Sequence, residues 1–171
     1  MELFIRAMLI SILLVSSISK FVSIKSFKKT VFQLFPNRIN SVVSILVPSI
    51  EIAIALCLFS SKLLIFGVFG LYVLLTIFLV VVVKNKDIKN IKCNCFGTLT
   101  DSVLGNKTLV HIFFLVLLNT FLLFSENHVA LIGTSAMYLV SLFSLCIGIV
   151  FIYILSISLY SYIKALNDVR H

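Results

Sequence analysis

Charged residues are scarce in this sequence. Asp, Glu, Lys and Arg together make up 12% of its 171 residues, against about 25% in a typical globular domain. Hydrophobic residues make up 61%, which is more than a soluble domain of this size could hide, because the excess would have to cover its surface. The composition therefore excludes an ordinary soluble domain and favours the lipid bilayer as the solvent.

Long polar segments are also missing. The connectors between the apolar blocks are short, so none of them could form a separate soluble domain. The blocks do not alternate in polarity, which excludes transmembrane strands, and they approach the about 20 residues that a helix needs to cross a bilayer. We therefore predict an all-α, polytopic transmembrane helical bundle, with spans at residues 3–19, 42–59, 63–83, 109–124 and about 137–162.

These spans divide the chain into a four-helix core and a C-terminal extension. The first block lacks a small-residue cleavage site and is followed directly by Lys20, so we interpret it as an uncleaved span and not as a secretory signal. We expect residues 1–125 to form a four-helix domain, and residues 126–171 to add a C-terminal helix and a short tail. In the third span, Gly67 and Gly70 could allow a close helix crossing.

The segment 20–40 between the first two spans is basic, and two interpretations of it stay open. It is either an ordinary charged loop or a short amphipathic helix that lies in the membrane interface and ends at Pro36. In the second case one face would carry the apolar residues Phe21, Ile24, Phe27, Val31, Phe32 and Leu34.

Basic residues outnumber acidic ones, 14 to 6. They lie at the ends of the apolar blocks, where they contact lipid headgroups, so we expect no nucleic acid as a partner. With five spans, the connectors after the first and third spans share one side of the membrane and carry most of the lysines. The opposite side has only Lys62 and Arg6. The positive-inside rule therefore predicts a cell-membrane protein whose loop between the third and fourth spans faces the cytoplasm.

The four cysteines are of two kinds. Cys57 and Cys146 lie inside apolar spans, where a free cysteine behaves as a small apolar residue. Cys93 and Cys95 lie in the polar loop beside Lys92, and nearby positive charge favours the reactive thiolate. A pair separated by one residue could form a small, strained disulfide that is easily reduced. Such a disulfide suits electron exchange better than structural cross-linking.

Two alternatives to redox chemistry remain for this cysteine pair. Zinc needs about four ligands, and the loop offers two thiolates, so we predict no metal centre. Copper(I) could accept two thiolates, and an inert pair is the other alternative. Redox chemistry is the interpretation that we favour.

Glu51 is the second notable residue, because it lies near the middle of an apolar span. A charged side chain at that depth costs at least about 2.5–3.5 kcal/mol, so it should face the bundle interior and have a partner. Lys20, at the end of the first span, is the candidate partner. The pair could carry a proton, position a ligand or serve only as a structural contact. For Asn119 in the fourth span we expect an interhelical hydrogen bond.

Three motifs resemble those of the MauE family of membrane proteins, within the wider DoxX-like group. The family pattern is similar to Ser-Gly-x-x-Lys, Pro-x-x-Glu and Cys-Gly-Cys-Phe-Gly, in that order. This chain departs from it at Asn94, where the family has glycine, and at His111-Ile112, where an Arg-Asn pair is common. The matching segments, at similar separations, are Ser17-Ile18-Ser19-Lys20, Pro48-Ser49-Ile50-Glu51 and Cys93-Asn94-Cys95-Phe96-Gly97.

The resemblance implies a redox-associated membrane protein in which Cys93 and Cys95 are the redox pair. Phe96 and Gly97 would complete the loop motif. The resemblance marks Lys20, Pro48 and Glu51 as motif positions without defining their roles. The family's named member is associated with methylamine utilisation, and with maturation of the disulfide-rich small (beta) subunit of methylamine dehydrogenase.

We therefore expect a thiol–disulfide relay between a disulfide-containing or thioredoxin-like partner protein and a membrane acceptor. A membrane quinone is one candidate acceptor, and no fixed cofactor is expected. Two other functions remain open: a non-enzymatic assembly or immunity partner, and a small transporter that uses Glu51. Disulfide formation belongs outside the cytoplasm, whereas the lysine count puts the Cys93 loop inside, so the side of the membrane on which the loop lies is the open question.

Overall fold

The computed structural model describes residues 2–34, 40–84, 92–93, 102–103, 106–124 and 135–169. Its elements confirm the predicted all-α membrane bundle. Two very short strands, β1 and β2, lie between the fourth and fifth helices. The bounds are α1 Glu2–Val22, α2 Ile24–Leu34, α3 Asn40–Phe59, α4 Leu64–Lys84, β1 Lys92–Cys93, β2 Ser102–Val103, α5 Asn106–Phe124 and α6 Ala136–Val169.

Helix length and composition identify the membrane-crossing elements. Four stretches in the described part of the chain qualify: Glu2–Val22, Ser41–Phe59, Leu64–Lys84 and Ala136–Leu159. The apolar part of α5, Leu109–Phe124, is shorter. The predicted spans coincide with these five helices to within a few residues, and the chain is a multi-pass membrane protein.

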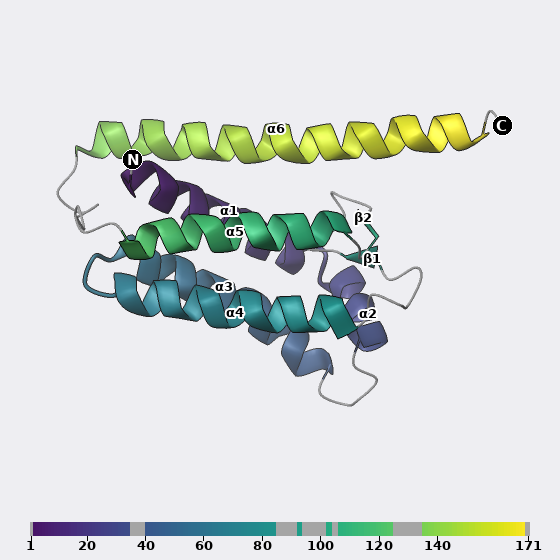
Figure 1. Ribbon diagram of the computed structural model, residues 1–171, viewed down its shortest axis with the longest axis horizontal. Helices are drawn as coiled ribbons and strands as arrows, with labels where there is room; N and C mark the ends of the chain where they lie inside the picture. The colour runs from purple at the N-terminus through teal and green to yellow at the C-terminus, as the bar shows by residue number, and fades with distance from the viewer. Residues whose placement is uncertain are drawn as a thin grey trace.

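Helices α1, α3, α4 and α5 pack side by side, and successive long helices run in opposite directions (Figure 1). Helix α1 is the central element, because it contacts α3, α5 and α6. Its span is 61% buried inside the protein, whereas the span of α6 is only 17% buried. Helix α6 therefore lies along the outside of the bundle and leaves most of its surface to lipid.

Small residues bring α3 and α4 close together. A Cβ atom added to Gly67 would lie 3.0 Å from the backbone nitrogen of Leu58, and one added to Gly70 would lie 3.2 Å from Ile54. These distances are tighter than ordinary van der Waals contact. The two glycines therefore permit the close crossing that the sequence predicted. Leu58 and Ile54 are buried in the core that forms around this contact.

The basic connector is helical. Helix α2 packs against α3 and buries Phe27 and Val31. The predicted apolar face is wrong for Phe21, which is exposed and lies in the last turn of α1 and not in α2. It is also wrong for Phe32, which is exposed because it lies more than a quarter-turn round α2 from Phe27. Pro36, the predicted end of this helix, lies outside the described residues. The outward surface of α2 also carries the exposed lysines Lys25, Lys28 and Lys29.

The strands β1 and β2 pair in antiparallel fashion, with Lys92 opposite Val103 and Cys93 opposite Ser102. They lie at the end of the bundle where α5 begins, the same end as α2 (Figure 1). The backbone of Cys93 is therefore held close to the start of α5.

Candidate functional site

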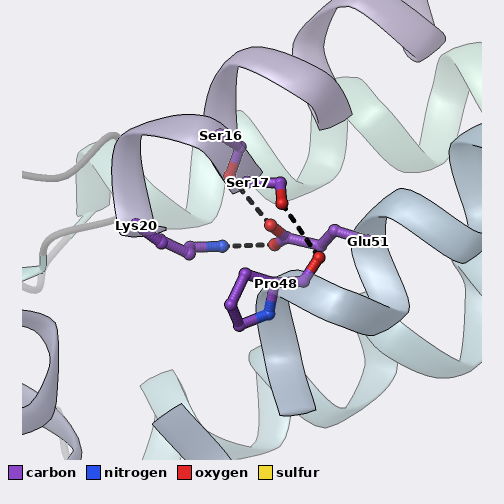
Figure 2. Close-up of polar contacts among 5 residues, drawn as sticks. All are labelled: Ser16, Ser17, Lys20, Pro48 and Glu51. Carbon is purple, nitrogen blue, oxygen red and sulfur yellow. Dashed lines mark hydrogen bonds and ion pairs between the residues drawn. The ribbon is translucent and has the colours of Figure 1, made fainter. Parts of the chain in front are cut away.

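A buried ion pair joins α1 to α3. Lys20 lies in the last turn of α1, and Glu51 lies near the middle of α3. The Lys20 Nζ atom pairs with Oε1 of Glu51 (Figure 2), and the two side chains are only 2% and 3% exposed. The structure thus forms the pair that the sequence predicted. It also makes the site neutral overall, which lowers the cost of holding two charges in an apolar bundle.

Two serines of α1 complete this contact. Ser16 Oγ donates to Oε2 of Glu51 at 3.4 Å, and Ser17 Oγ donates to the backbone carbonyl of Pro48 at 2.9 Å. Residues three and four positions apart share one face of a helix, so Ser16, Ser17 and Lys20 all reach α3, where Pro48 and Glu51 lie one turn apart. Figure 2 shows two of the sequence motifs meeting at this single contact.

Two aromatic rings also contact the Lys20 ammonium. Its Nζ atom lies 5.7 Å from the ring centroid of Phe27 on α2 and 5.4 Å from that of Phe78 on α4. Both distances are within the range of about 6 Å for a cation–π contact. One ammonium group therefore links four helices.

A cavity of about 70 Å³ lies beside the ion pair. Its wall is mostly apolar, and its polar lining comes from Ser16 and Lys20 on α1, Glu51 on α3 and His111 on α5. The apolar lining consists of Ile12, Leu13, Leu71, Leu74, Leu75, Phe78, Ile112 and Leu115.

His111 entered the sequence analysis only as a departure from the family motif, and its position in the cavity wall was not foreseen. Its Nδ1 atom lies 3.1 Å from the hydroxyl oxygen of Tyr153 on α6. The two rings are stacked, with centroids 5.2 Å apart. Helix α6 therefore contacts His111, a residue that lines the cavity.

Arg6 is a second buried cation, and sequence reasoning missed its role. It is fully buried; its Nε donates to the carbonyl of Leu58 and its Nη2 donates to that of Phe59 at 3.0 Å. The last carbonyls of a helix lack intrahelical donors, so the guanidinium group caps the C-terminus of α3. The signal was present, because a cation inside an apolar block is as costly as Glu51.

The remaining predictions can be placed individually. Asn119 Nδ2 donates to the carbonyl of Val68 at 3.1 Å, which confirms the interhelical hydrogen bond. Cys57 and Cys146 are free thiols, half-buried and buried. Cys93 lies in β1, whereas Cys95, Phe96 and Gly97 fall outside the described residues. Within the described ranges, no group of three His, Cys, Asp or Glu side chains could hold a metal ion.

The fold and the site define a multi-pass membrane protein whose first and third helices are joined by a buried Lys–Glu pair. Residues 1–125 match the family model described as "Methylamine utilisation protein MauE". The chain belongs to this family. The match covers α1 to α5 and excludes α6. No curated protein and no solved structure matches the chain.

Proposed function

We propose that this protein is a membrane thiol–disulfide relay in which Cys93 and Cys95 exchange electrons with a partner protein. The observation that carries the proposal is the family membership of residues 1–125 together with the CxCFG sequence at 93–97. The β1–β2 pairing supports it as well, because it pairs the backbone of Cys93 with β2, at the end of the bundle where α5 begins (Figure 1). Lys92 immediately precedes Cys93, and its charge favours the thiolate.

The relay has two half-reactions. A thiolate of the partner attacks one sulfur of the Cys93–Cys95 disulfide and forms a mixed disulfide. The second partner thiol then displaces the relay cysteine, so that the partner gains its disulfide and the relay becomes a dithiol. A two-electron acceptor in the membrane reoxidises the dithiol, taking two electrons and two protons.

The client is a protein that acquires disulfides. The small subunit of methylamine dehydrogenase is the client that the family's name suggests, and another exported disulfide-containing protein would meet the same chemical requirement. Disulfides persist in oxidising compartments, so this function needs the Cys93 loop on the outer face of the membrane. The lysine count favours the opposite orientation.

The direct test is to substitute each cysteine in cells that make a disulfide-containing client. We expect Cys93→Ser and Cys95→Ser each to reduce client oxidation at least a hundredfold, while the protein still inserts into the membrane. Cys57→Ser is the matched control, because that thiol lies within α3, and it should leave client oxidation unchanged. Full client oxidation in both loop variants would rule out the relay and favour a non-enzymatic assembly partner.

A second measurement decides the orientation. A membrane-impermeant thiol reagent should label Cys93 and Cys95 in intact cells only after mild reduction, if the pair is an oxidised relay on the outer face. Labelling that requires opened cells would instead put the pair on the reducing side and contradict a role in disulfide formation.

A further inference from the structure

Helix α2 lies where the bilayer ends. It begins at Ile24, directly after the first span, and ends at Leu34, before the next span begins at Ser41. Its 11 residues are too few to cross a bilayer, which takes about 20. The two spans that it connects place α2 at one end of the bundle (Figure 1). The helix is therefore at the depth of the lipid headgroups on that side.

Contacts with the bundle decide which face of α2 points outward. Phe27 and Val31 are one turn apart, and both are buried. The helix packs against α3, and the ring of Phe27 contacts the Lys20 ammonium of α1. These contacts hold one side of α2 against the bundle, so the opposite side faces the surroundings of the protein.

Three lysines occupy this outward side. Lys25, Lys28 and Lys29 are exposed, and their spacing of three and four positions puts them on one face of the helix. At 100° per residue, Lys25 and Lys29 each lie about 160° round the helix from Phe27. Lys28 Nζ also donates to the hydroxyl of Ser41 at 3.2 Å, which is an uncharged acceptor. The outward face therefore carries three positive charges close together.

Acidic side chains do not neutralise this face. The segment 20–40 contains no Asp and no Glu. Of the acidic side chains that the structure describes, Glu2 and Glu51 are both buried, and Glu51 pairs with Lys20. Lys84, which is exposed at the end of α4, adds a positive charge at the same end of the bundle (Figure 1). The charge of this end fits an anionic partner.

An apolar side chain on the same face favours lipid over an acidic protein. Phe32 is 61% exposed and follows Lys28 and Lys29 by four and three positions, so it lies on their face. Phe21 and Val22, in the last turn of α1, are also exposed. Aromatic rings are enriched at the boundary between headgroups and acyl chains. A phospholipid offers both a charged headgroup for the lysines and an acyl chain for the ring.

We propose that the outward face of α2, formed by Lys25, Lys28, Lys29 and Phe32, binds anionic phospholipids. The ammonium groups contact the headgroup, and the ring lies among the upper parts of the acyl chains. Each lysine near an anionic membrane surface strengthens the attraction roughly fivefold. This lipid site uses neither the cysteine pair nor the buried ion pair, so it does not depend on the proposed relay.

The test uses a fluorophore placed on the face itself. The sequence contains no Trp, so Phe32→Trp introduces a single indole at an exposed position. The full chain is placed in nanodiscs of phosphatidylcholine that contain the same mole fraction of either brominated phosphatidylglycerol or brominated phosphatidylcholine. Bromine quenches an indole that it contacts, so the two quenching curves give the relative association constant of the two lipids.

We expect this relative association constant to favour phosphatidylglycerol at least fivefold. Equal quenching by the two brominated lipids would overturn the proposal. Quenching by an aqueous quencher, with none by either lipid, would also overturn it, because the face would then lie in water and an acidic protein would be the better partner.

Lysine variants in the Phe32→Trp background test whether charge is the cause. The triple variant Lys25→Gln/Lys28→Gln/Lys29→Gln should bring the lipid preference close to one, whereas the corresponding triple substitution by Arg should keep it. Lys62→Gln is the matched control, because Lys62 is exposed in the turn after α3, at the opposite end of the bundle, and it should leave the preference unchanged. A preference that survives the Gln substitutions would overturn the proposal.

Salt provides an independent measure of the same interaction. The Debye length falls from about 10 Å at about 0.1 M salt to about 3 Å at about 1 M. The preference for phosphatidylglycerol should therefore fall at least twofold over this range in the protein that carries the lysines. A preference that does not change with salt would contradict binding through the lysine charges.

Discussion

Helix α1 carries two fully buried cations, Arg6 and Lys20, about four helical turns apart, and both reach α3. Arg6 donates to backbone carbonyls at the C-terminus of α3, partners that every helix end provides. Lys20 pairs with the Glu51 side chain, beside a cavity that both residues line. The comparison separates two uses of a buried charge: Arg6 fixes how the helices join, whereas Lys20 neutralises a buried carboxylate.

The largest expected effect is that of breaking the ion pair from one side. Lys20→Met or Glu51→Leu alone leaves the partner's charge buried and should lower the free energy of unfolding by about 3–5 kcal/mol. The double variant should be close to the wild type. Unfolding in mixed micelles with increasing denaturing detergent measures all three. Additive losses in the double variant would show that the two charges do not depend on each other.

Arg6→Met is expected to be next in size. It removes two charge-assisted hydrogen bonds, each of about 1.5–3 kcal/mol, and leaves the carbonyls of Leu58 and Phe59 without this donor. We expect a loss of about 3 kcal/mol in the same unfolding assay, with partial recovery in Arg6→Lys. An unchanged free energy of unfolding in Arg6→Met would show that Arg6 does not determine how α1 and α3 join.

Ser17→Ala should have the smallest effect. Ser17 lies between the two cations in sequence and makes an uncharged bond to the carbonyl of Pro48. Hydrogen bonds between membrane helices contribute about 0.6 kcal/mol on average, so the loss should be below about 1 kcal/mol. Ser19→Ala is a useful comparison, since Ser19 is on the same helix but is not part of the site. A loss as large as that of Arg6→Met would show that charge is not what holds α1 to α3.

Much of the fold could be predicted because it depends on local hydrophobicity. The apolar blocks determine where the helices lie, and the pair Gly67 and Gly70 indicates where two of them approach closely. The ion pair could be predicted, because burying the Glu51 carboxylate inside the membrane without a partner costs so much free energy that a cation was expected nearby. The same argument applied to Arg6, but the two groups on α3 to which it donates are backbone carbonyls, and no side chain in the sequence marks those carbonyls.

The place of His111 could not be predicted. Its position in the cavity depends on how α5 is rotated and shifted against α1 and α4. Its contact with Tyr153 depends on α6, which lies outside the family match. Similarly, Phe32 is as apolar as Phe27 on the same helix but is exposed, because the side of α2 that packs against α3 is decided by the tertiary structure.

By itself, the sequence determined that this protein is a bundle of membrane helices with a cysteine pair in a polar loop, because helix length and apolar content are properties of each segment alone. Tertiary structure decided which buried charges meet and where a cavity remains. Those outcomes depend on the depth, tilt and rotation of one helix against another, and no single segment encodes them. Lys20 and Arg6 are similar in the sequence, because each is a basic residue within the same apolar block. The difference between their partners arises from how α1 packs against α3.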